Sequence, residues 1–419
     1  QINKVVEMIK RDDEMNPIEI YEKAIVAKKQ GKDKDAVSNF LQAVNLNYTP
    51  AKQELGSCYY YGIGVKKNFQ KAFNLYLEAA LEGYAPAMYD VACCYERGEG
   101  VEKNFETALK WFIEAANGED ADGQTSLGDL YLTGRGIEKD LKKAVYWFKN
   151  AADQGDCYGE YRLAECYYEG IGVEKDYEKC LYWHQKAADQ GYKESIYCLG
   201  DAYFYGQGVE VNYKKAFEYY KMAIDEEIPE AIYSVGWCYK KGLGVRKNYK
   251  KAFHYFEKSA KLKYPPAMDA LGYAYEYGEG IEKDTNQSIY WYKKAAKKNV
   301  KLAQYSVGYY YDQIKDYKNA IHWYKKAALQ NDDDAQLMMG YHYHCGHGVK
   351  QNDKKAVFWY TLAAKQENER AEYNLGLCYL YGDGVKKDIN QAKYWFECAA
   401  KQGHKKSKNQ LLKLSSNEV

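Results

Sequence analysis

The segment from residue 341 to residue 347 holds three of the seven histidines and one of the eleven cysteines. Imidazole nitrogens and thiolate sulfurs are ligands that zinc prefers. On a helix, His342 and Cys345 would share a face, with His344 and His347 close in sequence. No second ligand pair lies nearby, so one buried and two surface histidines explain the segment more simply than a metal site does. We therefore predict no metal here and keep a metal-binding module around His342–His347 as an alternative.

Glycine pairs separated by one residue recur nine times, as at Gly62 and Gly64. A glycine loop before a helix can bind phosphate, but a dinucleotide-binding loop follows a strand, needs a third glycine and occurs once. These loops are therefore expected to be turns. Nucleophilic catalysis needs a Cys or Ser beside a base and an orienting group, and we identify no such set. The sequence predicts no catalytic residue, no cofactor and no enzyme.

The glycine loops belong to an internal repeat with a period of 36 residues, shortened once to 32. In each unit, apolar residues follow helical spacing in two segments, as at Ala51 and Leu55 and then at Ala72 and Tyr76. The pair from Ala303 to Ala328 is shorter and lacks the glycine loop. The pattern Leu-Gly-x-x-Tyr, or a close variant, begins at Leu55, Val91, Leu127, Leu163, Leu199, Val235, Leu271, Val307, Met339 and Leu375.

Two columns of equivalent residues mark the second helix of each unit. An Asn or Asp stands where a side chain can accept a hydrogen bond from the free N–H groups of the first turn. Seven of the eight Trp residues also share one place, and the residue after each, including His184, is interpreted as inter-helix packing. Trp237 alone lies outside that column. The predicted caps are Asn68, Asn104, Asp140, Asp176, Asn212, Asn248, Asp284, Asp316, Asn352 and Asp388.

One helix pair cannot bury its own apolar face, so the pairs must stack. We expect an all-α protein, an α/α right-handed superhelical solenoid of about eleven helix-turn-helix repeats over residues 17–406. Residues 1–16 place Ile2, Val5, Val6 and Ile9 on one helical face. They are expected to form an N-terminal capping helix or the remnant of an upstream segment. Residues 407–419 are expected to form a C-terminal capping helix and tail.

The repeat resembles the Sel-1-like repeat, a relative of the tetratricopeptide repeat, over about residues 17 to 412. The resemblance implies a non-catalytic interaction protein. Members of such families are adaptors and scaffolds in protein quality control, regulators of membrane-bound synthases, and bacterial proteins that face a host or a competitor. The residues that carry it are, for example, Ala371, Leu375, Gly376, Tyr379, Gly382, Gly384, Val385, Lys387, Asp388, Ala392, Trp395, Phe396, Ala399 and Ala400.

Some secreted bacterial members of this family carry a disulfide in each repeat, but this sequence has alanine, as at Ala80 and Ala116, where one cysteine would sit. A different place, on the inner face of the first helix, is shared by five cysteines. Equivalent residues of stacked units lie about 8–10 Å apart, too far for a disulfide. We expect free thiols and a cytoplasmic protein. The five are Cys58, Cys94, Cys166, Cys238 and Cys378.

The 47 tyrosines exceed what helix packing needs. In tetratricopeptide relatives the first helices line the concave side and contact ligand peptides, so the resemblance implies an aromatic ladder there. One set of equivalent residues, the first column, lies two residues before the Leu-Gly motif and could instead pack against the adjacent repeat. The second column lies one residue after the glycine of that motif. The predicted contact residues are Tyr161, Tyr197, Tyr233, Tyr305 and Tyr373 in the first column and Trp237, Tyr273, Tyr309 and Tyr341 in the second.

These observations predict an adaptor or scaffold that binds a peptide or protein partner on its concave surface and is a monomer in isolation. With 60 Lys and Arg against 59 Asp and Glu, the net charge is +1, which gives no basic surplus for nucleic acid. No apolar run is long enough for membrane insertion. The alternative from another class is an inhibitor or immunity-type protein that wraps a single enzyme.

Overall fold

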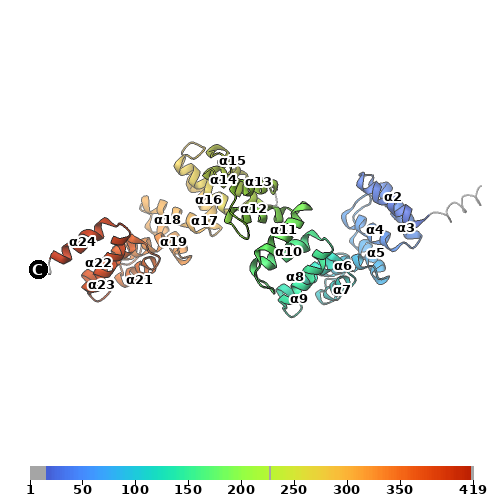
Figure 1. Ribbon diagram of the computed structural model, residues 1–419, viewed down its shortest axis with the longest axis horizontal. Helices are drawn as coiled ribbons and strands as arrows, with labels where there is room; N and C mark the ends of the chain where they lie inside the picture. Colours follow the sequence, from blue (N-terminus) through green and yellow to red (C-terminus); the bar gives the residue numbers. More distant parts are fainter. Residues whose placement is uncertain (1–15, 226–227, 417–419) are drawn as a thin grey trace, which may run out of the picture. The chain divides into compact units, whose positions relative to one another are not determined.

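The computed structural model describes residues 16–225 and 228–416, which contain 23 helices and no strand (Figure 1). The helices form ten packed pairs, five in each of two compact units, and α12, α13 and α24 complete the series, as an α-solenoid of the predicted class requires. The chain divides into two compact units, residues 1–211 and 212–419. The predicted N-terminal helix over residues 1–16 lies, apart from Asn16, outside the described residues.

In the first unit the helices are α2 (Pro17–Lys29), α3 (Asp33–Asn45), α4 (Thr49–Tyr61), α5 (Phe69–Leu81), α6 (Ala85–Arg97), α7 (Phe105–Asn117), α8 (Ala121–Thr133), α9 (Leu141–Asp153), α10 (Cys157–Glu169), α11 (Tyr177–Asp189) and α12 (Lys193–Tyr205).

In the second unit they are α13 (Tyr213–Met222), α14 (Pro229–Lys241), α15 (Tyr249–Lys261), α16 (Pro265–Tyr277), α17 (Thr285–Lys297), α18 (Lys301–Gln313), α19 (Tyr317–Leu329), α20 (Asp333–Cys345), α21 (Asp353–Ala364), α22 (Glu369–Tyr381), α23 (Ile389–Lys401) and α24 (Lys405–Ser416).

Local sequence signals set the helix boundaries. All ten predicted Asn and Asp caps accept a hydrogen bond from a backbone N–H in the first turn of the following helix, as when Asn104 accepts from Thr107. Each such bond satisfies a donor that the helix itself cannot pair. The first helices of nine of these ten repeats end at a glycine in the left-handed region, such as Gly62 with φ 78°.

The second glycine of each loop joins one repeat to the one before it. At Gly280 an added Cβ would lie 2.2 Å from the carbonyl oxygen of Tyr249, the first residue of α15. Gly348 meets Tyr317, the first residue of α19, in the same way. Only glycine allows such an approach, so the loop covers the start of the preceding repeat's second helix.

The core lies between the two helices of each pair and between neighbouring pairs. Alanines and one large residue per repeat fill it; Phe148, Phe256 and Phe396, for example, are fully or almost fully buried. The five cysteines predicted as core residues are buried, and all eleven cysteines are free thiols. The first helices α6, α8 and α10 of the first unit, and α16 and α18 of the second, approach each other directly, which places these first helices on the inner side of each array.

The described helices have at most 13 residues. A membrane-spanning helix needs about 20 residues. In the part of the chain that the structure describes, no helix is long and apolar enough to cross a membrane. Of the segment 407–419 predicted as a C-terminal cap and tail, residues 407–416 belong to α24, which packs against α23, and residues 417–419 lie outside the described residues.

Candidate partner-binding groove

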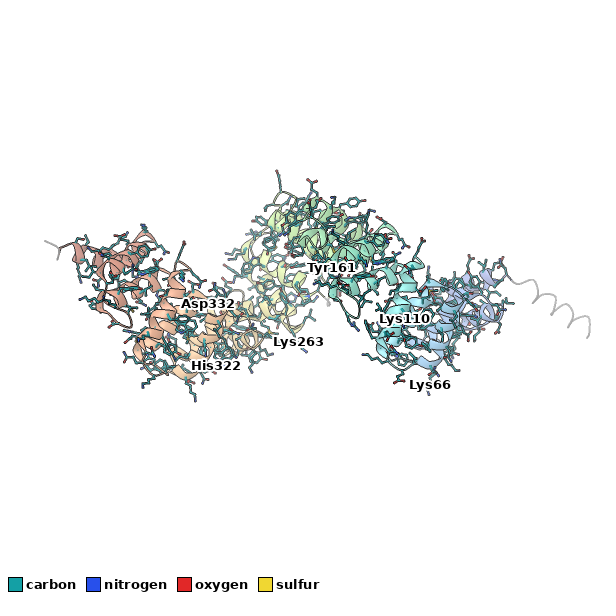
Figure 2. The ribbon with its side chains drawn as sticks, turned by 90° about the horizontal axis from the view of Figure 1, so that it is seen from below. Lys66, Lys110, Tyr161, Lys263, His322 and Asp332 are labelled. Atoms are coloured by element: carbon teal, nitrogen blue, oxygen red, sulfur yellow. The ribbon has the colours of Figure 1, made fainter. Side chains whose placement is uncertain are left out.

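The first column of predicted contact tyrosines is half-buried. Tyr161 lies on α10 (Figure 2), and its ring centroid is 5.9 Å from that of His184 and 5.3 Å from that of Tyr192. Tyr233 packs in the same way against Phe256, at 5.4 Å, and Tyr264. Each ring thus fills space between its own repeat's second helix and the start of the next repeat. Such contacts are those expected if the first column packs against the adjacent repeat. A binding role stays a prediction for the five residues of this column, Tyr161, Tyr197, Tyr233, Tyr305 and Tyr373.

The second column is more open to solvent. Tyr273, Tyr309 and Tyr341 are 38%, 47% and 41% exposed. Trp237 is half-buried, and its ring stacks on Tyr233 with 6.2 Å between centroids. These four residues lie on the inner first helices of the second unit. The equivalent places in the first unit hold Ser57, Cys93, Asp129, Glu165 and Asp201.

The structure brings three predicted residues, Tyr273, Tyr305 and Tyr309, into one groove with a volume of about 800 Å³. Helices α16, α17 and α18 form it. None of the other lining residues was predicted as a contact residue; Tyr292 follows Trp291 and was interpreted as inter-helix packing. The other lining residues are Asp269, Glu276, Tyr277, Thr285, Ser288, Ile289, Tyr292, Leu302, Ser306, Tyr310, Gln313 and Ile314.

The missing glycine loop opens this groove. Elsewhere the second glycine of a loop lies on the first residue of the preceding second helix. Only three residues, 314–316, connect α18 to α19, whereas seven, 346–352, connect α20 to α21. The first residue of α17, Thr285, is therefore left exposed, and it lines the groove. The sequence signal for this groove was the one shortened repeat, in which the Leu-Gly motif recurs after 32 residues instead of 36.

The groove is acidic as well as aromatic. It contains the carboxyl groups of Asp269 and Glu276 and, among the described lining residues, no Lys, Arg or His. Tyr292 Oη donates a hydrogen bond of 2.8 Å to Glu276. Asp269 replaces a tyrosine of the first column, and its buried Oδ1 makes no hydrogen bond. Burial raises the pKa of Asp269 to about 6, although Lys240 opposes that shift. A cation entering the groove would relieve this desolvated carboxylate.

Among the described residues, the alternative metal-binding module around His342–His347 does not bring three ligand atoms together. His342 is fully buried, with Nε2 3.4 Å from Asp312 Oδ1, while His344 Nδ1 lies 2.9 Å from Asp353 and Cys345 is exposed. His347 stacks on the ring of Tyr317, at 4.6 Å. The rings of His342 and His347 lie 6.0 Å apart and both contact Tyr317. His344 and Cys345 lie elsewhere, because consecutive residues of a helix point in different directions. Burial lowers the pKa of His342.

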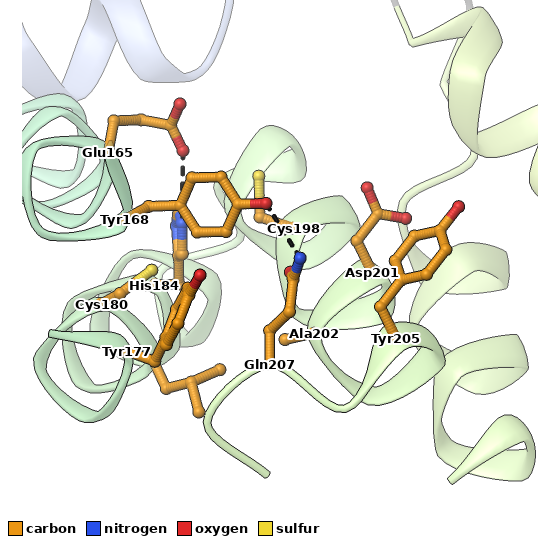
Figure 3. Close-up of a pocket in the computed structure, with 11 residues that line it drawn as sticks. Glu165, Tyr168, Tyr177, Cys180, His184, Cys198, Asp201, Ala202, Tyr205 and Gln207 are labelled. Atoms are coloured by element: carbon orange, nitrogen blue, oxygen red, sulfur yellow. Dashed lines mark hydrogen bonds and ion pairs between the residues drawn. The ribbon is translucent and has the colours of Figure 1, made fainter. Parts of the chain in front are cut away.

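Among the described residues, one group could hold a metal ion, and it lies in the first unit. Glu165, His184 and Cys198 have ligand atoms that all lie within 4.8 Å of one another. They come from α10, α11 and α12 and line a cavity of about 210 Å³ (Figure 3). Burial raises the pKa of the Cys198 thiol well above its usual value. Sequence reasoning treated His184 only as a packing residue, and it is also buried.

Comparisons with known proteins agree with this architecture. The family model described as Sel1 repeat matches ten successive segments, residues 49–84, 85–120, 121–156, 157–192, 193–227, 229–264, 265–300, 301–332, 333–368 and 369–404. A search of the curated proteins found no match. Sel1 repeats typically mediate protein–protein interactions and generally form a non-enzymatic fold.

Solved structures show the same fold. One is c5321, a protective antigen of uropathogenic Escherichia coli strains with an SLR fold; it is 29% identical, with a TM-score of 0.78, over 97% of this chain and 91% of that chain. A Sel1 repeat protein from Oxalobacter formigenes is 31% identical, with a TM-score of 0.53, over 58% of this chain and 96% of that chain. Immunity protein Pa5087 from Pseudomonas aeruginosa, at 22% identity and a TM-score of 0.35, is too distant to inform function. Because its ten repeats span most of the sequence, the chain belongs to the Sel1 repeat family.

Proposed function

We propose that this chain is a non-catalytic interaction protein that binds a peptide segment of a protein partner in the groove formed by α16, α17 and α18. The groove itself carries the proposal. It has six tyrosines, a volume that accommodates several side chains, and an opening made by the shortened connection between α18 and α19. Tyrosine gives a large contact area and a polar tip at low entropic cost, which suits a recognition surface.

The lining residues define the kind of peptide. Leu302 and Ile314, on α18 and just after it, are 59% and 55% exposed and offer contacts to apolar side chains. Asp269 and Glu276 supply negative charge. An arginine or lysine of the peptide could pair with these carboxylates, and an arginine could also stack on a tyrosine ring. The partner segment should therefore combine a basic residue with apolar anchors.

Selection from a random peptide library against the full chain tests this proposal. Selected peptides should be rich in Arg or Lys with apolar neighbours. Tyr273→Ala and Tyr309→Ala should each weaken their binding about tenfold or more, which corresponds to about 1.4 kcal/mol. Both rings are exposed, so the thermal melt should hardly change. The matched control is Tyr394→Ala, which removes an exposed tyrosine of α23 outside the groove.

A loop insertion tests the groove without removing any aromatic residue that lines it. Residues 314–316 would be replaced by the sequence of residues 346–352, which supplies the glycine loop that this repeat lacks. The inserted loop should cover Thr285 and displace bound peptide. Peptides that bind the loop variant and both tyrosine variants as tightly as the parent chain would refute the proposed site.

A further inference from the structure

We infer that the first unit contains a binding site for one divalent transition-metal ion, foremost Zn²⁺, with Glu165, His184 and Cys198 as its protein ligands. This site lies on α10, α11 and α12, outside the proposed groove on α16, α17 and α18. The two proposals can therefore succeed or fail independently.

Two departures from the repeat build the site. His184 occupies a place that holds Tyr or Phe in each of the nine other repeats. Ser195 occupies a place that holds Ala or Gly in each of the nine others. The equivalents of His184 are Tyr76, Phe112, Phe148, Tyr220, Phe256, Tyr292, Tyr324, Tyr360 and Phe396, and those of Ser195 are Ala51, Ala87, Gly123, Gly159, Ala231, Ala267, Ala303, Ala335 and Ala371.

The two exceptional residues contact each other. His184 Nδ1 and Ser195 Oγ share a hydrogen bond of 3.1 Å, and both side chains are buried. The hydroxyl gives one nitrogen of the buried imidazole a hydrogen-bond partner, which fixes the orientation of the ring. With Nδ1–H donating to Ser195, the lone pair lies on Nε2, as in metal-bound histidines whose other nitrogen is held by an outer hydrogen bond. Serine thereby positions the imidazole.

The other nitrogen of the imidazole, Nε2, lies near the other two ligands. His184 Nε2 lies 3.5 Å from Glu165 Oε1 (Figure 3). Zinc bond lengths of about 2.0 to 2.3 Å put tetrahedral ligand atoms roughly 3.3 to 3.8 Å apart. The three ligand atoms here are no more than 4.8 Å apart, so small side-chain rotations suffice. The cavity of about 210 Å³ leaves room for a water molecule as the fourth ligand.

The ligand chemistry selects the ion. Nitrogen, sulfur and carboxylate oxygen together suit Zn²⁺, whereas Ca²⁺ and Mg²⁺ take oxygen ligands. On binding, the Cys198 thiol loses its proton to solvent and the thiolate coordinates the ion. The ion would then tie α10 and α11 of one repeat to α12 of the next, which adds a cross-link between neighbouring repeats.

The test uses the full chain, freed of metal with a chelator, and Zn²⁺ or Co²⁺ alone as the probe. Titration calorimetry should give one tight Zn²⁺ site per chain, and Zn²⁺ should raise the melting temperature. Bound Co²⁺ should show thiolate-to-cobalt charge-transfer absorption. Cys198→Ser should abolish that absorption, whereas Cys345→Ser, in the histidine-rich segment 341–347, should leave it unchanged.

A second variant separates loss of metal from loss of fold. His184→Phe with Ser195→Ala restores the residue types of the other repeats, so it should melt in chelator at least as high as the parent chain. It should not bind Zn²⁺ at this site or be stabilised by it. Zn²⁺ binding that survives this double change, a Co²⁺ spectrum without thiolate absorption, or the absence of a tight site in the parent chain would each overturn the assignment.

Discussion

Acidification should weaken binding of a basic peptide to the groove of the second unit, because Asp269 supplies charge only when it is ionised. Burial raises the pKa of Asp269 from its usual value of 3.8 to about 6 in the free protein. A lysine or arginine placed beside it would return the pKa toward its usual range. At pH 5 about nine tenths of the free protein then carries a neutral Asp269, so affinity should be about tenfold lower than at pH 8, or about 1.4 kcal/mol.

The assay is calorimetric titration of a selected peptide, with blocked ends and no Asp, Glu or His, from pH 5 to pH 8 at constant ionic strength. Affinity should rise with pH through about 6 and then level off. Asp269→Asn should bind weakly and without that rise, and a peptide with its basic residue replaced by Gln should give the same flat profile. A parent chain whose affinity is flat, or increases on acidification, would refute the electrostatic role of Asp269.

Three further predictions concern stability. Burial raises the pKa of Asp90 to about 7. Ionisation of Asp90 therefore destabilises the folded state at every pH above the pKa that this group has in the unfolded chain. In urea denaturation, Asp90→Asn should raise the free energy of unfolding by about 2–4 kcal/mol at pH 8 and leave it unchanged near pH 4. Burial lowers the pKa of His342, so the folded state should become less stable as the pH falls below about 6.5. The urea midpoint of the parent chain should therefore be lower at pH 5 than at pH 8. His342→Cys, which introduces the residue found at this place in five repeats, should make that difference in midpoint smaller. Asn104→Ala should cost about 1 kcal/mol in the same urea assay, because it removes the acceptor for the Thr107 N–H, while Asn104→Asp should cost little.

The helix pairs and their boundaries could be read from the sequence because their causes are local. Apolar periodicity, a cap such as Asn104 and a stop such as Gly62 act within one or two turns. Tyr273, Tyr305 and Tyr309 could be placed together on first helices for the same reason. Whether a column tyrosine such as Tyr233 is buried or open depends on the neighbouring repeat, which local pattern does not describe.

The sequence could not identify which ligands meet. His342, His344, Cys345 and His347 are close along the chain, yet only His342 and His347 share a neighbour, Tyr317. His344 contacts Asp353, and Cys345 is exposed. Glu165, His184 and Cys198 are separated by up to 33 residues, and only the packing of three helices gathers them. The one available signal was comparison between repeats, which makes His184 and Ser195 stand out as a joint exception.

The sequence by itself determined that this chain is a stack of helix pairs, because every repeat carries its own periodicity, cap and stop, and because no pair can bury its apolar face alone. Only the tertiary structure determined where the stack has a groove and where it gathers Glu165, His184 and Cys198. The omitted loop leaves Thr285 uncovered only because that loop would have reached back to the preceding repeat. Burial of Asp269 and the approach of His184 to Ser195 likewise arise from contacts between helices, and such contacts follow from packing in space rather than from order along the chain.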